Sequence, residues 1–443
     1  MDEQTKKRLL HRGVVEVIVE SEFLKRLDEG KPLRLKMGFD PSRADIHLGH
    51  VVGLRKLRQF QEEGHKVILI VGDWTAQIGD PTGQSVTRPM LTAEAVRENA
   101  QSYLRQFFKV VDPDKTQVVW QSEWFGNFTL ANIIKLTSYF TVAQFLARED
   151  FNNRFKEGRP IAITELMYPL LQAYDSVAIE SDVEFGGTDQ KFNLLVGREL
   201  QEKMGQRRQQ CLIMPILPGT DGVRKMSKSL DNYIAVEEAP SEMFGKVMSL
   251  PDTMIVPYME LLTDLPAADI EEIRQSIGAP SFNPMDAKKR LGAELVAIFH
   301  DSVAARQARE NFERVVQRKE APEEAGLVAT PVWASGSPEG ALWPDFRVQT
   351  AGGESFAVDM SQQRNGGPSV SIEVAEGSFL IDLGELLTKG GIAPSKGQVK
   401  RLLAQGGIEV DGSKVESMVC AVRPGGLIKA GKRDYIRIAQ ASE

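Results

Sequence analysis

The sequence predicts an α/β protein built on a mainly parallel sheet, followed by a helical domain and a small α+β domain. Between about residues 33 and 230, short apolar segments alternate with segments of helical periodicity, which indicates a parallel sheet with helices on both faces. From Ser241 to about Arg318 the pattern is helical. A stretch rich in Gly, Ser, Pro and Glu then precedes an ordered C-terminal end.

The first and largest domain is therefore expected to be Rossmann-like, after an amphipathic helical lead-in over residues 1–30. Its ligands should bind beyond the carboxyl ends of the strands. The expected strands are Leu33–Met37, Val67–Gly72, Thr116–Gln121, Val177–Ser181 and Cys211–Leu217. The expected helices are His50–Glu63, Thr92–Phe108, Leu130–Arg148 and Asp189–Lys203.

The shifts in pattern also predict the domain boundaries. We expect the Rossmann-like domain over 1–230, with an insertion at about 122–165, and a helical domain over 231–320. Residues 321–377 are expected to be a linker or small module, and 378–443 a C-terminal domain. In the helical domain, Asn283 is the expected N-cap of a helix that has Pro284 at its first position.

Composition excludes several classes of protein. With 443 residues, 42% hydrophobic and carrying a net charge of −7, the chain has ample core but no overall positive field for nucleic acid, so any such site must be a local patch. Its two cysteines, Cys211 and Cys420, form no CxxC pattern or cysteine–histidine cluster, so we expect neither a protein-bound metal nor a disulfide framework. No apolar signal region or membrane-length run occurs, which favours a cytoplasmic protein.

The turn between the first expected strand and helix carries the first candidate site. His47 and His50 lie three residues apart at the expected helix start, with Gly49 between them. One helical turn places both imidazoles on the same side, and the free backbone N–H groups of a helix start favour a phosphate. Taken alone, such a pair is more often an ordinary surface or core pair.

A second basic motif follows the strand expected at Cys211–Leu217. Lys225-Met226-Ser227-Lys228-Ser229 places two lysines among small residues, which suits a mobile loop that closes on a polyphosphate. Alone it would be read as a solvated basic turn. The two motifs together, in this order and on these elements, are far more specific.

A polar stripe lies within an otherwise apolar helical segment. Tyr168, Gln172 and Asp175 are spaced i, i+4 and i+7, so they share one helix face. Such a stripe either lines a pocket or is an ordinary solvated face, and helix amphipathicity alone leaves these two readings about equal.

Two further stretches join polar groups to turns. Asp80 follows a strand and should lie at its carboxyl end, although Asp-Pro-Thr-Gly is also a plain turn sequence. Gly187, Asp189 and Gln190 combine close backbone approach with polar side chains at a helix start, where a glycine turn with an N-cap is the simpler interpretation.

These motifs resemble those of a known family. The histidine and lysine motifs look like the two signatures of the class I aminoacyl-tRNA synthetases. Gly38-Phe39-Asp40-Pro41, Gly79-Asp80-Pro81-Thr82-Gly83, Tyr168 to Ser176 and Gly187-Thr188-Asp189-Gln190 are similar, in order, to the bacterial tyrosyl-tRNA synthetases, over residues 33 to about 300. The resemblance implies tyrosine activation with ATP and Mg²⁺, transfer of tyrosine to the terminal adenosine of tRNA(Tyr), and a helical domain near the anticodon.

The resemblance also implies residue roles. Asp175 would face the substrate phenol, while His47, His50, Lys225, Lys228 and Arg88 would act on the phosphates as the catalytic set. The implied ATP site comprises Gly38, Asp40, Ser42, His47, Gly49, His50, Gly187, Asp189, Lys225, Met226, Ser227 and Lys228. The implied tyrosine site comprises Lys36, Gly38, Asp80, Tyr168, Gln172, Asp175 and Gln190.

The sequence departs from the family pattern at two positions. Lys36 stands where many members have a tyrosine that contacts the substrate hydroxyl, which puts that second contact in doubt. Gln84 stands where a lysine often helps to bind pyrophosphate, so more of that charge should rest on Lys225, Lys228 and Arg88.

The C-terminal region resembles a small RNA-binding fold shared with a ribosomal protein. From Ser378 onward, ten Lys/Arg stand against seven Asp/Glu, a net of +3, although this excess also fits a neutral appendage. The candidate tRNA phosphate contacts are Lys400, Arg401, Lys432 and Arg433. A helix ending in glycine and a strand turning at Asp411-Gly412 are expected there.

The sequence leaves three alternative functions open and also predicts a homodimer. The alternatives to tyrosine are tryptophan activation, a related nucleotidyltransferase that makes a small metabolite, and a catalytically silent RNA-binding paralogue. The intact histidines and lysines argue against the silent paralogue. We also expect a homodimer, paired through the apolar run from Leu136 to Phe155, which contains Tyr139, Phe140, Phe145 and Phe151.

Overall fold

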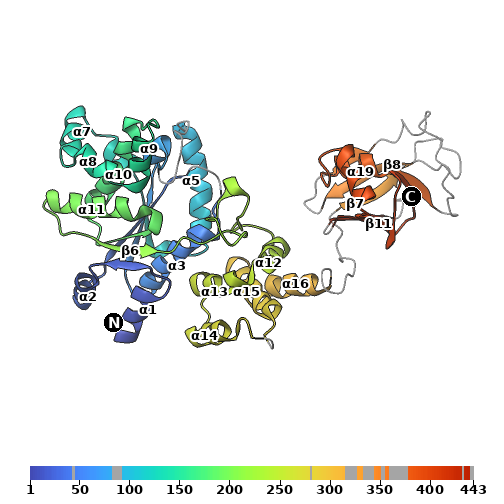
Figure 1. The fold of residues 1–443 in the computed structure, drawn as a ribbon, viewed down its shortest axis with the longest axis horizontal. Helices are drawn as coiled ribbons and strands as arrows, with labels where there is room; N and C mark the ends of the chain where they lie inside the picture. Colours follow the sequence, from blue (N-terminus) through green and yellow to red (C-terminus); the bar gives the residue numbers. More distant parts are fainter. Residues whose placement is uncertain are drawn as a thin grey trace. The chain divides into compact units, whose positions relative to one another are not determined.

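The chain folds into two compact units, Met1–Phe312 and Glu313–Glu443, as seen in a computed structural model (Figure 1). Each unit is described separately. The residues described are 1–41, 45–81, 92–279, 282–314, 327–332, 344–350, 355–358, 378–431 and 434–439.

The first unit is built on a six-stranded sheet in the order β1-β6-β5-β2-β3-β4. Strands β2 to β6 are parallel to their neighbours, and only β1 pairs antiparallel, at the edge, with β6. The predicted mainly parallel sheet is thus confirmed. The strands are β1 Glu16–Ile18, β2 Arg34–Phe39, β3 Lys66–Val71, β4 Thr116–Trp120, β5 Val183–Gly187 and β6 Gln210–Met214.

Both faces of this sheet are buried, as β3 shows. The main core, which includes the apolar face of helix α3 (Leu48–Glu62), contains Val67, Leu69 and Val71. A separate core on the opposite face contains Ile68 and Ile70. Every residue of β3 after Lys66 is buried, which is why the strand reads as a continuous apolar run.

Helices surround the sheet and continue beyond it. They are α1 Glu3–His11, α2 Glu20–Asp28, α3 Leu48–Glu62, α4 Thr75–Ile78, α5 Ala93–Phe107, α6 Ser122–Phe125, α7 Leu130–Thr137, α8 Val142–Leu146, α9 Glu149–Lys156, α10 Ile163–Ala178, α11 Lys191–Lys203, α12 Pro240–Met248, α13 Ile255–Leu262, α14 Ala267–Ser276, α15 Pro284–Phe299 and α16 Ser302–Phe312. Short 3₁₀ turns are η1 Pro113–Lys115, η2 Thr188–Gln190, η3 Lys228–Leu230 and η4 Asp252–Met254.

Two of the sequence-based elements are wrong. The strand expected at Val177–Ser181 is instead the end of α10 and a reversal at Glu180, whose φ is 49°, and the strand β5 follows it. A short apolar run could not distinguish the end of a buried helix from a buried strand. The single helix expected over Leu130–Arg148 is two helices, because Thr141 and Gln144 form a capping box that starts α8.

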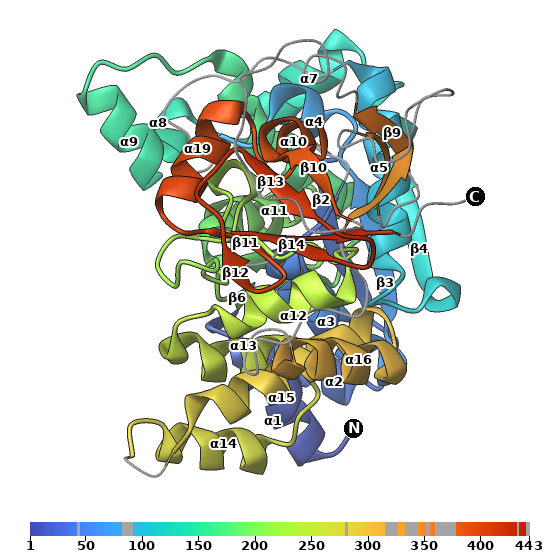
Figure 2. The ribbon, with the colours of Figure 1, turned by 90° about the vertical axis from the view of Figure 1, so that its right-hand side faces the viewer.

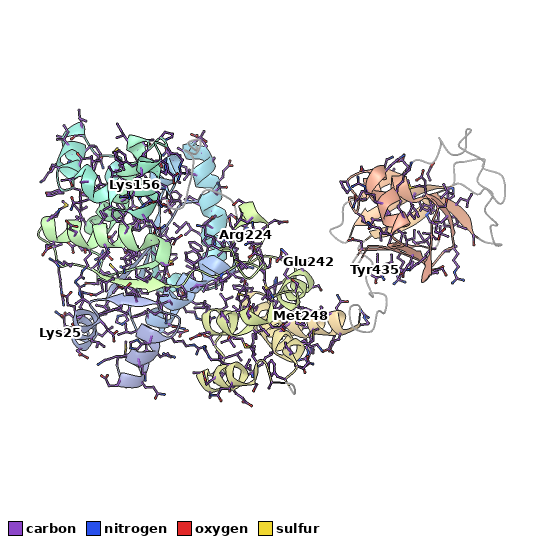
Figure 3. All side chains as sticks on the ribbon, viewed as in Figure 1. Lys25, Lys156, Arg224, Glu242, Met248 and Tyr435 are labelled. Atoms are coloured by element: carbon purple, nitrogen blue, oxygen red, sulfur yellow. The ribbon has the colours of Figure 1, made fainter. Side chains whose placement is uncertain are left out.

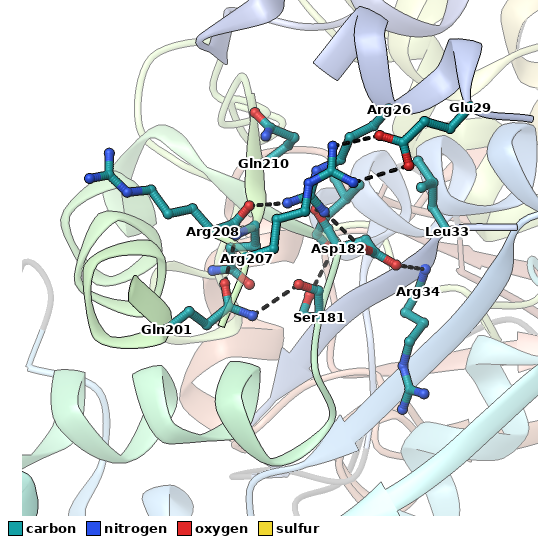
Figure 4. A network of polar contacts seen from close by, with 12 residues as sticks. Arg26, Glu29, Leu33, Arg34, Ser181, Asp182, Gln201, Arg207, Arg208 and Gln210 are labelled. Atoms are coloured by element: carbon teal, nitrogen blue, oxygen red, sulfur yellow. Dashed lines mark hydrogen bonds and ion pairs between the residues drawn. The ribbon is translucent and has the colours of Figure 1, made fainter. Parts of the chain in front are cut away.

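A polar network closes the end of the sheet where β2 and β5 begin (Figure 4). Asp182, just before β5, accepts hydrogen bonds from the guanidinium of Arg26 on α2 at 2.7 Å and from the backbone N–H of Arg34 at 3.0 Å. Arg207 pairs with Glu29 in the same network. These bonds fix the lead-in helix α2 to the two central strands at the edge opposite their carboxyl ends.

The helices α12 to α16 complete the first unit (Figure 2). Arg12 after α1 donates to the backbone oxygens of Thr263 and Leu265, and Arg55 on α3 pairs with Asp264. The helical region therefore packs on the sheet-covering helices as part of one unit, with no division between units at residue 230. Asn283 caps α15 and Pro284 is its first residue, as predicted.

The second unit contains a seven-stranded sheet in the order β12-β11-β14-β15-β7-β8-β9 and a two-stranded sheet, β10-β13. Residues 321–377, expected to be a linker or small module, contribute β7, β8 and β9 to the larger sheet, because β7 pairs in parallel with β15. The elements are β7 Leu327–Val332, β8 Asp345–Thr350, β9 Ser355–Val358, β10 Phe379–Asp382, α18 Leu383–Lys389, α19 Lys396–Ala404, β11 Ile408–Val410, β12 Ser413–Lys414, β13 Val419–Val422, β14 Leu427–Ala430 and β15 Asp434–Ile438.

The expected helix, glycine and turn of the C-terminal region are present. Helix α19 ends at Ala404, Gly406 follows with a φ of 63°, and the strand β11 begins at Ile408. Asp411 and Gly412 both have positive φ, which suits the tight turn into β12.

Candidate active site

A cavity of about 410 Å³ opens at the carboxyl ends of the central strands. Strands β3 and β4 extend the sheet to one side of β2, and β5 and β6 extend it to the other. The order in which successive strands are added therefore reverses between β2 and β5, which are parallel to each other. Such a switch point is where ligands bind in open α/β sheets. The predicted site residues that line the cavity are Gly38, Asp40, His47, Gly49, His50, Asp80, Tyr168, Gln172, Asp175, Gly187, Asp189, Gln190, Lys225, Met226 and Ser227.

Among the described residues, two of the predicted active-site residues, Lys228 and Lys36, do not line this cavity. Ser42 and Arg88 lie outside the described residues, as does Gln84. Lys228 binds Asp45 beside the cavity, with its Nζ 3.0 Å from Oδ2. Lys36, whose contact with tyrosine the sequence left in doubt, is fully buried in an ion pair with Glu184.

The two histidines form the start of α3. The backbone N–H of Gly49 donates to His47 Nδ1 at 3.2 Å, and the backbone N–H of His47 donates to His50 Nδ1 at 3.2 Å. Because both Nδ1 atoms accept, each ring carries its proton on Nε2 and is left with an N–H donor there. A Cβ on Gly49 would lie 2.9 Å from the His47 ring, so this position requires glycine for the histidine itself.

Both imidazoles are neutral at physiological pH. Burial, with help from His50 and the two loop lysines, lowers the pKa of His47 to about 2. Burial, with help from Lys228, lowers the pKa of His50 to about 4. The pair therefore presents neutral N–H donors at a helix N-terminus.

Asp175 is buried at the base of the polar stripe on α10. Gln121 Nε2, from the end of β4, donates to Asp175 Oδ2 at 2.9 Å. Neither Asp175 Oδ1 nor the indole nitrogen of Trp124 has a hydrogen bond of good geometry among the described residues. Burial raises the pKa of Asp175 to about 7, against the lowering effect of the charge on Lys36.

Tyr168 is oriented by a carboxylate on the opposite wall. Its hydroxyl donates to Asp40 Oδ2 at 2.8 Å, and Thr75 donates to Asp40 Oδ1 at 2.6 Å. Since its proton is committed to Asp40, the Tyr168 oxygen presents lone pairs to a donor in the cavity. Burial, followed by the charge of Asp40, raises the pKa of Tyr168 well above its usual value, so the phenol stays protonated.

The lysine loop is held by carboxylates and by one asparagine. Lys225 Nζ lies 3.6 Å from Asp189 Oδ2, so both signature lysines have acidic partners. The buried Asn232 accepts from the backbone N–H of Ser227 at 2.8 Å, and its amide donates to Asp221 at 3.0 Å and to the backbone oxygen of Lys225 at 3.1 Å. Arg224 marks this exposed loop in Figure 3.

The sequence reasoning missed several residues of the site. Gln121, Glu184 and Thr75 line the cavity, and Asn193 and Asn232 hold lining groups from behind. A charged residue inside an otherwise apolar strand, as at Glu184, is a signal that could have been used. The amides carry no comparable signal, because nothing in their local sequence shows what they face.

Comparison with known proteins identifies the family. The family described as "tRNA synthetases class I (W and Y)" matches residues 28–317. A tyrosine–tRNA ligase of Dehalococcoides mccartyi is 53% identical over 428 residues, which is 97% of each chain. The chain belongs to the bacterial tyrosyl-tRNA synthetase family. The predicted resemblance is confirmed, and the chain is a class I aminoacyl-tRNA synthetase.

Other relatives agree over nearly the full length of this synthetase. A tyrosine–tRNA ligase of Thermotoga maritima is 46% identical over 99% of this chain and 98% of its own. Among solved structures, the tyrosyl-tRNA synthetase of Archaeoglobus fulgidus complexed with L-tyrosine has a TM-score of 0.56 and 25% identity, covering 70% of this chain and all of its own. A mitochondrial tyrosyl-tRNA synthetase of Aspergillus nidulans, at 20% identity and a TM-score of 0.59, shares the fold over 71% of this chain and 94% of its own.

The part of the synthetase that the structure describes contains neither a metal-binding cluster nor a membrane-spanning helix. Among the described residues, no group of three or more His, Cys, Asp and Glu side chains is placed to hold a metal ion. None of the described helices combines the length and the apolar character that crossing a bilayer requires.

Proposed function

We propose that this cavity activates L-tyrosine with ATP to form tyrosyl-adenylate, and that the chain then transfers tyrosine to the 3′-terminal adenosine of tRNA(Tyr). The observation that carries the proposal is that one cavity contains both a buried acceptor, Asp175, and the phosphate-binding groups of α3 and the lysine loop. The buried acceptor suits a phenol, and the phosphate-binding groups suit a nucleotide.

Tyrosine binds through its two polar ends. Asp175 accepts the phenol O–H, while Tyr168, Gln172 and Asp80 surround the ammonium group and Gln190 lies near the carboxylate. A phenylalanine ring would leave the buried Asp175 carboxylate without its partner, and an unpaired buried acceptor is costly. Tryptophan, the runner-up substrate, also carries a donor, its indole N–H, so the amino-acid panel below is what distinguishes it from tyrosine.

The reaction is an in-line attack of the tyrosine carboxylate on the α-phosphorus of ATP. The new bond joins carboxylate oxygen to phosphorus, and the bond from the α-phosphorus to the bridging oxygen breaks to release pyrophosphate. The protein supplies position and charge: His47 and His50 donate N–H groups at the start of α3, and Lys225 and Lys228 stabilise the leaving phosphates. Asp189 binds the ribose, and Mg²⁺ enters with ATP.

The second unit is proposed to hold the tRNA. Lys400 and Arg401 lie exposed on α19, whose opposite side buries Val399 and Leu403. Their exposure leaves them free to meet tRNA phosphates, whereas Lys432 and Arg433 lie outside the described residues. In the second step, a hydroxyl of the terminal ribose attacks the adenylate carbonyl and AMP leaves.

A homodimer is proposed through the insertion, with a revised set of contacts. Phe145 and Phe151, expected at the interface, are core residues, and Tyr139 and Phe140 pack against that core. The exposed apolar side chains of the insertion and its flanks are Leu130, Ile134, Val142, Phe155 and Ile163, each at least 60% exposed. A patch of this kind on α7 to α10 is typical of a subunit interface.

Pyrophosphate exchange with a panel of amino acids tests the proposal. We expect exchange of labelled pyrophosphate into ATP with tyrosine and not with phenylalanine. Exchange with tryptophan and not tyrosine would overturn the substrate assignment. Absence of exchange with all amino acids would favour the silent paralogue.

A further inference from the structure

A buried ion pair lies beneath the tyrosine half of the cavity. Lys36 on β2 and Glu184 on β5 are directly paired in the sheet register, and both side chains are almost completely buried. Lys36 Nζ lies 2.8 Å from Glu184 Oε1. Two charges enclosed in the centre of a sheet are costly unless every polar atom has a partner, so the pair calls for an explanation.

Lys36 joins this pair to the helix that carries the polar stripe. Its three N–H groups are all used: by Glu184, by the backbone oxygen of Gln172 at 2.8 Å and by Ser176 Oγ at 2.7 Å. The hydroxyl of Ser176 in turn donates to Glu184 Oε2 at 3.2 Å. Gln172 and Ser176 lie on either side of Asp175 along α10.

Glu184 also begins a relay of amides that ends at a second carboxylate. Gln172 Nε2 donates to Glu184 Oε1 at 3.2 Å, and Gln190 Nε2 donates to Asp80 Oδ2 at 2.6 Å. Between the two glutamines, Asn193 Nδ2 donates to Gln172 Oε1 at 3.1 Å and to Gln190 Oε1 at 3.0 Å.

The two carboxylates determine the direction of every amide in this relay. A carboxylate only accepts, so each glutamine must turn its NH₂ group towards its acid and its oxygen towards the shared NH₂ of Asn193. The arrangement is self-consistent, and reversing one glutamine would place two donors or two acceptors together. Glu184 therefore fixes how Gln172 and Gln190 face the cavity.

The same pair acts on Asp175 with opposite signs. The positive charge of Lys36 favours the ionised carboxylate, and the negative charge of Glu184 opposes it. The other groups that face Asp175 are Tyr168 on its own helix and the neutral donors Gln121 and Trp124. Lys36 has the larger effect of the two charges.

We propose that Lys36 and Glu184 are positioning residues for tyrosine selection: Glu184 fixes the direction of the glutamine relay, and Lys36, anchored to Glu184, keeps Asp175 an acceptor for the phenol. This inference rests on the proposed function and adds to it the buried residues that position the groups facing tyrosine. Lys36 does not line the cavity, and Glu184 reaches its wall almost completely buried, so both act through the groups they hold.

The test compares Lys36→Met, Glu184→Gln and the double variant in tyrosine-dependent pyrophosphate exchange. The kcat/KM for tyrosine is measured at saturating ATP between about pH 5.5 and 8.5 and is corrected for the fraction of tyrosine whose α-amino group has lost its proton. Lys56→Met is the matched control, since Lys56 is also a buried lysine on backbone oxygens, those of Leu9 and Arg12, and lies outside the cavity.

The acid limb of this profile should move in opposite directions. It reflects protonation of Asp175, so Lys36→Met should shift it to higher pH by about one unit and Glu184→Gln to lower pH by a smaller amount. The double variant should shift the limb to higher pH by less than Lys36→Met alone, while the KM for tyrosine stays raised about tenfold and the KM for ATP changes little, as expected when hydrogen bonds to α10 are lost. The control should lower the melting temperature only.

Coincident acid limbs in the two single variants, shifts of the same sign, or equal changes in both KM values would overturn the proposal. Should Lys36→Met fail to fold, the Glu184→Gln and double-variant profiles decide the question. If the unchanged protein exchanges normally with tyrosine but the variants show no shift in the acid limb, only the role of the pair is refuted. Failure of the unchanged protein to exchange with tyrosine refutes the proposed function, and this inference with it.

Discussion

Removal of one amide should disable the lysine loop without affecting tyrosine binding. Asn232 is 3% exposed and ties Ser227, Lys225 and Asp221 together through three short hydrogen bonds, so it determines the loop conformation that presents both lysines. Its side chain lies outside the tyrosine half of the cavity. Asn232→Ala should therefore act on the phosphate side of the reaction.

The size of the effect follows from these contacts. Each hydrogen bond contributes about 1 kcal/mol net, so about 3 kcal/mol of loop stabilisation is lost with the amide. If that stabilisation is realised in the transition state, where the loop holds the leaving pyrophosphate, the activation rate should fall about 100-fold, at 1.4 kcal/mol per factor of ten. Tyrosine affinity should stay within about twofold, since no ground-state contact to tyrosine is removed.

Single-turnover formation of tyrosyl-adenylate at saturating ATP measures this rate, and equilibrium titration measures tyrosine affinity. Asn283→Ala is a matched control, because Asn283 also accepts from a backbone N–H, at the exposed start of α15, away from the cavity. An Asn232→Ala rate within threefold of the unchanged protein, or a loss of tyrosine affinity equal to the loss of rate, would refute the reasoning.

Four further predictions concern the other parts of the assignment. Asp175→Ala should abolish most tyrosine activation, measured by pyrophosphate exchange, while ATP binding by calorimetry stays nearly normal, since the residue faces only the phenol end. Lys228→Ala should lower the single-turnover rate more than tyrosine affinity, because its charge is needed most as pyrophosphate leaves. Ile134→Glu with Phe155→Glu should convert a dimer to a 49.1 kDa species in sedimentation, since charges would be placed on the exposed patch. A chain ending after Phe312 should keep pyrophosphate exchange and lose most tRNA charging at physiological salt, because phosphate contacts in the second unit are removed.

Each of these has a contradicting result. Normal activation by Asp175→Ala would show that the pocket assignment is wrong, and an unchanged single-turnover rate in Lys228→Ala would remove its transition-state role. A 49.1 kDa species from the unchanged protein at micromolar concentration would contradict the dimer. Full tRNA charging by the shortened chain would contradict RNA binding by the second unit, and loss of exchange would make that unit part of the catalytic fold.

The features that the sequence predicted correctly are those that residues close together in the chain determine. The apolar run of β3, the helical spacing after His50 and the N-cap at Asn283 each depend on neighbours in the chain, and each is found where expected. The histidine and lysine motifs were found because they occur together, in order, at the ends of elements, although each alone has an ordinary structural explanation.

What the sequence could not predict depends on tertiary pairing. Lys36 and Glu184 become an ion pair only through the register of β2 and β5, 148 positions apart in the chain, and no local pattern fixes a register between distant strands. The role of 327–358 likewise depended on one pairing, of β7 with β15. Phe145 and Phe151 were placed at the interface because a sequence does not distinguish an exposed apolar patch from core.

Both signature lysines have acidic partners before any substrate arrives, and this bears on catalysis. Lys225 lies near Asp189 and Lys228 on Asp45, while His47 and His50 are neutral. Binding ATP must therefore exchange one set of charge partners for another, which limits how much these lysines stabilise the bound ground state. Negative charge that builds up on the leaving pyrophosphate meets no such offset, so the lysines gain most as the bond breaks. Interactions that strengthen in the transition state are those that accelerate the reaction. The acidic partners of the lysines thus favour rate over ground-state affinity.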